Sequence, residues 1–234
     1  MQLKETSHIR SEEIQASGLE SRKVGGLIYV RGAALFPISW LHTQEFCEYQ
    51  IFLEHVRGIK VTPTRSLTEG KQEHQRLYDN FKKVAVPTTF EEMLAESEKV
   101  RVISREFKVF DTRHGIYGRI DEVLLTPDGL VVIDDKPGTR AFLSSMQQVR
   151  GYCLAFKERA RGLDYRSIIG ALRERGTNNM YWQEPFTTAV EEGTVGLVNH
   201  IRSMITGAKE FGSADNPNKC RSCRFSAKCD RTLA

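Results

Sequence analysis

The stretch of sequence that decides the fold is residues 118–136, which read GRIDEVLLTPDGLVVIDDK. Two runs rich in aliphatic and β-branched residues flank the turn sequence Thr126-Pro127-Asp128-Gly129. This pattern predicts two strands, at 115–125 and 129–136, joined by a tight turn. A third strand is predicted immediately upstream, at 100–110. We therefore expect a β-sheet at the centre of the fold.

Helices and further strands are predicted on both sides of this sheet. Downstream, the patterns predict a helix at 141–161, strands at 165–173 and 179–183 around a turn at Gly176, and a helix at 188–207. Upstream, they predict a short strand at 23–31, a helix at 39–56 capped by Ser39, a helix at 66–83 opened by the capping box Ser66-x-x-Glu69, and a shorter helix opened by Thr89-x-x-Glu92. This order is typical of the α/β class, with a mixed central sheet flanked by helices.

Composition sets broad limits on the kind of protein. The chain has 234 residues, which predicts either one domain of generous size or one domain with a small annex, and its net charge of +4 and 40% hydrophobic residues are close to the globular norm. Residues 1–38 are expected to be a lead-in, loose or locally helical over 1–22, ahead of a domain at 39–234. No apolar run approaches the roughly 18 residues of a membrane span, and the N-terminus lacks the apolar core of a secretory signal. We expect a soluble, cytoplasmic protein.

Two acids and a lysine form the strongest candidate site. On paired strands across a tight turn, Asp121 and Asp134 can face the same point in space. Alternation along the strand puts Lys136 on the same face as Asp134, and Asp135 on the other. Two carboxylates can hold a divalent cation, and a lysine beside them can orient water or stabilise the transition state. This combination is what metal-assisted phosphodiester cleavage requires.

Two further motifs fit such a site. His74 lies on the helix predicted at 66–83, and a neutral imidazole could complete a metal shell. Gln148 and Tyr152 are one helical turn apart, so their side chains share a face that could grip a phosphate or stack on a base.

The motifs Gly70-Lys71-x-x-His74, Gly118-Arg119-Ile120-Asp121, Asp134-x-Lys136 and Gln148-x-x-x-Tyr152 occur in this order. The series resembles the RecB-type branch of the PD-(D/E)xK nuclease superfamily. The resemblance implies that Mn²⁺ or Mg²⁺ is held by His74, Asp121, Asp134 and the main-chain carbonyl of Asp135. It also implies that Lys136 is the catalytic lysine and that Gln148 and Tyr152 bind DNA.

Three charged residues near these motifs have less specific interpretations. Arg119 and Arg150 could contact phosphate, with ion pairing as the alternative for each. Glu106 could approach the metal through a water molecule, but we interpret it as a solvated acid on a strand face.

The cysteines predict a second metal centre. In a chain without an export signal, metal ligation or burial is expected rather than disulfides. Cys47 and the C-terminal motif Cys220-x2-Cys223-x5-Cys229 supply four thiolates. Zinc ribbons usually use two local pairs, so a set divided into one and three suits a [4Fe–4S] cluster. A zinc site in the tail is the alternative.

Such a cluster would form an annex that joins the helix at 39–57 to the tail at 216–234. The fifth cysteine, Cys153, is expected to be buried on its helix. The split cysteine pattern is similar to that of the iron–sulfur subgroup of RecB-type nucleases.

Within that subgroup, the short chain most resembles the CRISPR-associated exonuclease family, the fourth of the numbered core Cas proteins. The resemblance implies 5′ to 3′ degradation of single-stranded DNA, DNA ends as the main partner, and CRISPR integrase proteins as further partners in spacer acquisition. A RecB-like repair nuclease unconnected with CRISPR and a non-catalytic DNA-binding assembly subunit are the alternatives.

Overall fold

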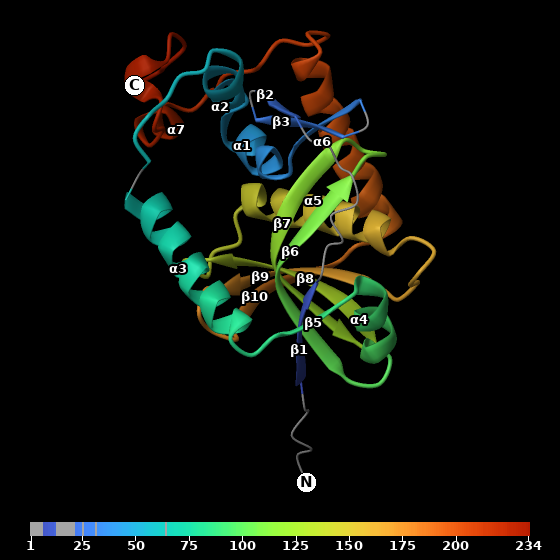
Figure 1. Ribbon diagram of the computed structural model, residues 1–234. Helices are drawn as coiled ribbons and strands as arrows, with labels where there is room; N and C mark the ends of the chain where they lie inside the picture. The colour runs from blue at the N-terminus through green and yellow to red at the C-terminus, as the bar shows by residue number, and fades with distance from the viewer. Residues whose placement is uncertain (1–6, 13–21, 25, 31, 64) are drawn as a thin grey trace.

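The fold is a mixed β-sheet with helices packed against it (Figure 1). The computed structural model describes residues 7–12, 22–24, 26–30, 32–63 and 65–234. Among these, no helix is long and apolar enough to cross a membrane.

The hairpin expected at the centre of the sheet is present. Strands β7 (Ile116–Thr126) and β8 (Gly129–Lys136) pair in antiparallel register, with Thr126 opposite Gly129. The Thr126 hydroxyl donates to the Gly129 carbonyl at 2.9 Å and accepts from its amide at 3.2 Å, which closes the turn. Strand β6 (Arg101–Asp111) pairs antiparallel with the other edge of β7. All three predicted strands are confirmed.

The remaining strands extend the sheet on both sides. Strand β9 (Ile168–Glu174) runs parallel to β8, and β10 (Met180–Pro185) pairs antiparallel with β9. Strand β4 (Ala33–Pro37) runs parallel to the start of β7. The predicted mixed sheet is therefore confirmed.

Two predictions near the N-terminus are wrong. Residues Ser7–Glu12 form strand β1, parallel to β6 and to β5 (Val86–Thr88), instead of a loose or helical lead-in. Remote partners hold this polar segment: Arg10 and His8 both contact the Glu96 carboxylate. The single strand expected at 23–31 is a pair of antiparallel strands, β2 (Arg22–Val24) and β3 (Leu27–Val30), with a positive φ at Gly26 between them. Residues 1–6, 13–21, 25 and 31 lie outside the described part of the chain.

The helix expected at 39–56 is interrupted. It consists of α1 (Ser39–Cys47), α2 (Tyr49–Ile51) and a π-helical turn (Phe52–Val56). The break follows from a tertiary contact, because the Tyr49 amide donates to the Gly212 carbonyl at 2.9 Å. Ser39 does not cap this helix, since Ile38 holds the cap position with helical backbone angles.

Four other helices agree with the sequence patterns: α3 (Arg65–Lys82), α4 (Phe90–Ser97), α5 (Leu143–Ala160) and α6 (Thr188–Ile205). The tail adds two short elements that were not predicted, α7 (Pro217–Arg221) and a 3-10 turn (Ser226–Lys228). The Thr89 capping box of α4 has both of its hydrogen bonds. The side chain of Ser66 lies outside the described residues.

The main core lies between the sheet and helices α4, α5 and α6. Phe90 of α4, Phe107 of β6 and Phe156 of α5 form a cluster with ring centroids 5.3–5.7 Å apart. Two glycines allow α1 and β7 to approach α5 closely. A Cβ at Gly151 would lie 2.3 Å from Leu41, and a Cβ at Gly118 would lie 2.7 Å from Tyr152. This packing places the middle of α5 directly over β7 and β8.

Candidate functional site

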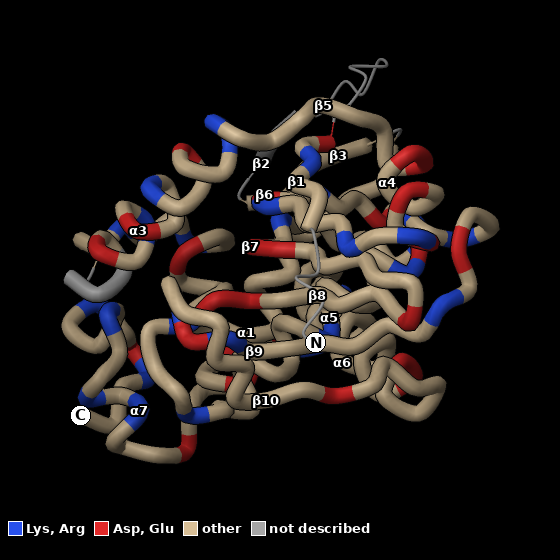
Figure 2. Tube along the Cα trace, turned by 90° about the horizontal axis from the view of Figure 1, so that it is seen from below, with Lys and Arg blue, Asp and Glu red and all other residues tan. Residues whose placement is uncertain are grey.

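One histidine and two acids from three elements meet at the edge of a cleft. His74 of α3 places Nδ1 at 3.4 Å from Asp121 Oδ1 of β7 and at 3.8 Å from Glu106 Oε1 of β6. One possible ligand atom from each of these residues lies within 4.8 Å of the others. Imidazole nitrogen and carboxylate oxygen are both ligands for divalent metals. Acidic positions on β7 and β8 lie side by side toward α3 (Figure 2).

Asp121 has an unusual protonation equilibrium. Burial and the nearby Asp134 charge raise its pKa to about 7, against the opposing effect of His74. The nearby Glu106 carboxylate raises the pKa of His74, and the Asp121 charge adds to this shift against partial burial. The Asp135 amide donates to Asp121 Oδ2 at 2.7 Å and fixes the orientation of the carboxylate. The cluster thus concentrates negative charge where a cation could neutralise it.

Glu106 is a member of this cluster, and its interpretation as a solvated strand acid is wrong. Its side chain is 7% exposed, and its carboxylate lies 2.6 Å from Arg119 Nε. Its φ of 55° is left-handed, which is strained for a residue with a side chain. The β6–β7 register could have indicated its position, because Arg105 pairs with Glu122 and Phe107 with Ile120, so Glu106 falls opposite Asp121.

Asp134 and Lys136 lie on one face at the end of β8. Lys136 Nζ is 2.7 Å from Asp134 Oδ2, and this buried oxygen accepts no hydrogen bond within the described part of the chain. Lys136 Nζ also donates to Gln148 Oε1 at 3.3 Å, and Gln148 Nε2 donates to the Tyr152 hydroxyl at 3.1 Å. Asp134 is outside the three-residue set around His74, although its charge acts on Asp121. The four predicted residues form one chain of polar contacts.

Asp135 points to the opposite face of the sheet. Its carboxylate accepts hydrogen bonds from Arg105 and Arg173, which also bind Glu122, so three buried charges and the partly buried Arg105 lie across strands β6 to β9. Burial raises the pKa of Asp135, but the two guanidinium groups outweigh it and hold the pKa below its ordinary value. The Asp135 carbonyl accepts a hydrogen bond from Arg175 at 3.1 Å.

The two arginines considered for phosphate contact are both paired with acids. Arg119 contacts Glu106, as described above. Arg150 donates two hydrogen bonds to Glu184, at 2.7 and 2.8 Å.

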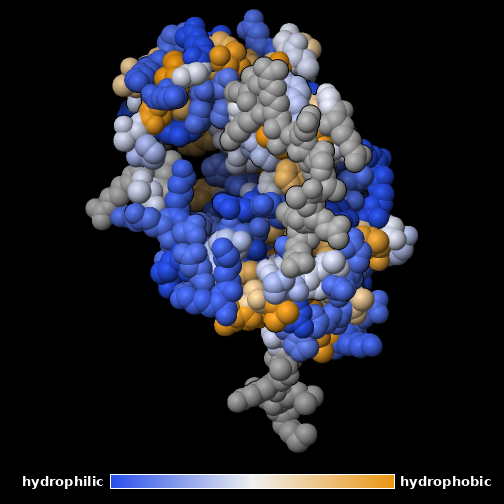
Figure 3. Space-filling model, viewed as in Figure 1, coloured by the Kyte–Doolittle hydropathy of each residue, from blue (hydrophilic) through white to orange (hydrophobic). Residues whose placement is uncertain are grey.

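The catalytic candidates border an open cleft. Its lining includes Lys71 and Tyr78 of α3 in addition to His74, Asp121 and Gln148. The space-filling view shows the molecule hollowed between α3 and the C-terminal region (Figure 3).

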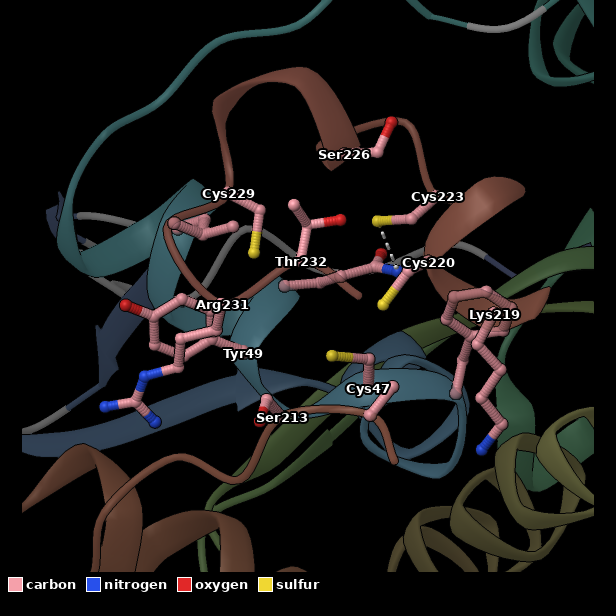
Figure 4. A pocket seen from close by; sticks show the side chains of 14 residues that line it. Cys47, Tyr49, Ser213, Lys219, Cys220, Cys223, Ser226, Cys229, Arg231 and Thr232 are labelled. Carbon is pink, nitrogen blue, oxygen red and sulfur yellow. Dashed lines mark hydrogen bonds between the residues drawn. The ribbon is translucent and has the colours of Figure 1, made fainter. Parts of the chain in front are cut away.

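Four cysteines form a separate cluster. Cys47, Cys220, Cys223 and Cys229 line one cavity between the end of α1 and the C-terminal tail. Their sulfur atoms point toward a common space (Figure 4). Beside them, Phe225 is fully buried against Tyr49 and Leu53. Cys153 is buried in the main core, far from this cavity in the fold.

The spacing of the sulfur atoms differs from that of the His74 cluster. No three of the four sulfurs all lie within 4.8 Å of one another, and over the described residues only His74, Glu106 and Asp121 meet this condition. Tetrahedral zinc with bonds of about 2.3 Å holds sulfurs roughly 3.8 Å apart.

Both the sequence and the fold of the chain are similar to those of known proteins. The family model described as the PD-(D/E)XK nuclease superfamily matches residues 65–230. Similar solved structures include the crystal structure of SSO0001, with 14% identity, a TM-score of 0.44, and coverage of 86% of this chain and 88% of that chain. They also include a protein from Eubacterium rectale described as "Putative exonuclease", with 12% identity, a TM-score of 0.48, and coverage of 86% and 89%. The curated proteins gave no match.

Proposed function

Since the chain belongs to the PD-(D/E)XK nuclease superfamily, we propose that it is a metal-dependent exonuclease that cuts DNA at the cleft between α3 and the sheet. The observation that carries this proposal is the meeting of His74, Glu106 and Asp121 beside the Asp134–Lys136 pair. Nuclease chemistry follows from the superfamily. The exonuclease mode, the DNA substrate and the residue roles are parts of the proposal.

The residues fit a divalent cation such as Mn²⁺ or Mg²⁺. Asp134 Oδ2 is buried without a hydrogen bond, and Asp121 retains its proton up to about pH 7 when no cation neutralises the cluster. We assign the cation to His74, Asp121, Asp134 and the Asp135 carbonyl. A carbonyl oxygen has two lone pairs, so the hydrogen bond from Arg175 leaves one available. One imidazole nitrogen among oxygens is compatible with Mn²⁺.

The remaining groups have roles that follow from their contacts. A bound cation supplies Lewis acidity and lowers the pKa of water. Lys136 stabilises negative charge on the phosphate, and Gln148 holds its ammonium in place. The Asp135 amide keeps the Asp121 carboxylate oriented. Glu106 orients His74 and places further negative charge beside it.

Replacement of Lys136 tests this assignment. Lys136→Ala should abolish Mn²⁺-dependent cleavage of end-labelled single-stranded DNA but leave DNA binding unchanged. Lys157→Ala is the matched control, because Lys157 pairs with Glu191 toward the far end of α5. If Lys136→Ala cleaved DNA at a rate within a few-fold of the parent, Lys136 would not be the catalytic lysine. An inactive parent that still binds DNA would favour a non-catalytic assembly subunit.

We also propose that the cysteine cavity holds a [4Fe–4S] cluster. Its support is the convergence of four thiolates from two distant segments on one cavity. The cluster would hold α1 and the π-helical turn against the tail, beside the cleft.

The motif series and the split cysteine pattern support a narrower proposal. In it, the enzyme degrades single-stranded DNA from 5′ to 3′ and trims fragments for CRISPR spacer capture together with integrase proteins. Substrates labelled separately at each end test the polarity. Co-purification with an integrase tests the pathway, and a RecB-like repair nuclease remains the alternative outcome.

A further inference from the structure

An exposed apolar patch follows the catalytic lysine. Residues 137–143 connect β8 to α5, and every one of them is exposed. At the end of this connection, the side chain of Phe142 is 53% exposed and that of Leu143 is 45% exposed. Exposure of two adjacent large apolar side chains to water costs free energy, and a ligand that covers them removes this cost.

The patch lies close to the proposed site. Phe142 immediately precedes α5, and Gln148, which binds Lys136, is six residues further along that helix. At 1.5 Å rise per residue, the two positions are about 9 Å apart along the helix axis. This distance corresponds to roughly two to three stacked nucleotides at about 3.4 Å each. The side chains at these two positions point about 120° apart around the helix, so a strand whose phosphate lies at Lys136 reaches Phe142 by passing around the N-terminal end of α5.

A positive charge accompanies the aromatic ring. The Arg140 guanidinium carbon lies 4.9 Å from the centroid of the Phe142 ring. In the described part of the chain, Arg140 makes no ion pair and no hydrogen bond, whereas Arg119 and Arg150 are both bound to acids. The cation nearest the patch thus remains available for a phosphate.

We propose that Phe142 and Arg140 form a stacking platform for an unpaired base of the DNA strand held at the catalytic site. The proposal rests on the proposed nuclease function and deepens it. The base covers the exposed ring, and Arg140 contacts the adjacent phosphate. A base inside a duplex already has both faces covered by its neighbours. The platform therefore selects single-stranded ends.

Binding of single-stranded oligonucleotides without divalent metal tests the platform. Phe142→Ala should weaken binding about 5- to 100-fold, the range for the loss of one stacked base. Phe142→Trp should restore it. Tyr165→Ala is the matched control, because Tyr165 is 91% exposed but lies beyond the opposite end of α5. Thermal melting checks that each variant is folded.

A modified strand identifies the stacked base directly. An oligonucleotide carrying 2-aminopurine at successive positions should show quenching at one position with the parent protein, and none there with Phe142→Ala. An abasic nucleotide at that position should remove the difference in affinity between the parent and Phe142→Ala. Arg140→Ala should reduce the slope of log affinity against log salt by about 0.7, the value for one single-strand phosphate.

The outcomes separate the two proposals. If the parent binds single strands but Phe142→Ala behaves like Tyr165→Ala, the platform is wrong and the patch serves another partner, while the nuclease proposal stands. Equal losses of affinity for single strands and blunt duplexes would also overturn the platform. If the parent binds no DNA, the proposed function fails and the platform fails with it.

Discussion

Protonation of Asp121 makes the stability of the folded protein depend on pH. In the metal-free fold its pKa is about 7, whereas in the unfolded chain it returns to its ordinary value of 3.8. Between these values the folded protein binds more protons than the unfolded chain, so this carboxyl makes stability fall as pH rises. A bound cation competes with the proton for the Asp121 carboxylate, so with the cation present this group makes stability rise with pH.

Asp121→Asn should therefore change both stability and activity. With a chelator present, the parent should lose several degrees of Tm between about pH 5 and about pH 8, and the variant should lose less. Added Mn²⁺ should stabilise the parent most at the higher pH and should not stabilise the variant. The variant should also lose metal-dependent cleavage. If the Tm of the parent and of the variant fell equally over this pH range, a titrating group other than Asp121 would cause the loss of stability.

Glu106 has the one left-handed backbone conformation among the described residues other than glycine. In an ordinary strand, glycine is less stable than alanine by about 0.5–1 kcal/mol. Where φ is left-handed, the Cβ atom is the source of strain and the order inverts. Glu106→Gly should thus be about 1 kcal/mol more stable than Glu106→Ala in urea unfolding, although both lose the same carboxylate. A more stable alanine variant would show that the backbone here is relaxed.

At the scale of elements, the annex joins α1 and the π-helical turn to the tail. Phe225 is the one fully buried large side chain of the tail, and such burial contributes roughly 1.5–3 kcal/mol. Ordering each residue of the tail costs about 1 kcal/mol or more. Hydrogen bonds such as that from the Tyr49 hydroxyl to Asp230 add little at the exposed edge. Metal ligation is expected to supply the difference.

Replacement of any one of the four annex cysteines by alanine should abolish the visible absorbance of the iron–thiolate centre. It should also make the tail sensitive to protease, because the remaining contacts are too weak to hold it. Cys153→Ala is the control and should do neither, since Cys153 lies in the main core. A colourless parent containing stoichiometric zinc, or a Cys47→Ala variant with full iron content, would contradict the cluster.

The charge network across β6 to β9 is a second element-scale feature. Arg173 binds both Glu122 and Asp135, and all three are buried. Arg173→Met should destabilise the protein by about 3–5 kcal/mol in urea unfolding, because two buried carboxylates then share Arg105 alone. Arg76→Ala, which removes an exposed pair with Glu73, should have no measurable effect. Equal effects of the two variants would show that the buried network is not selectively stabilising.

Across the molecule, the features that could be predicted from the sequence are those that depend on residues close together in the chain. The turn at Thr126 to Gly129, the β7–β8 hairpin and the capping box at Thr89 depend on neighbouring residues, and all three are confirmed. Strand β1 depends on Glu96, and the break after Cys47 depends on Gly212, so neither could be found from local patterns.

The same distinction applies to the candidate site. Period-two alternation places Asp134 and Lys136 on one face of β8 and Asp135 on the other, as the contacts show. Glu106 could not be interpreted in this way, because its left-handed φ interrupts the regular alternation of β6. The exposed Phe142 could not be identified either, because the helical pattern of apolar residues around it predicts burial.

The annex also sets the order of events during biosynthesis. Tyr49 and its partner Asp230 are separated by 181 positions. At about 5–20 residues per second, roughly 10–40 s pass between their synthesis on the ribosome. The central hairpin closes a short loop and can form within this interval. Throughout it, the Cys47 thiol and the apolar side chains beside it are without their partners from the tail, so the annex forms later than the central hairpin.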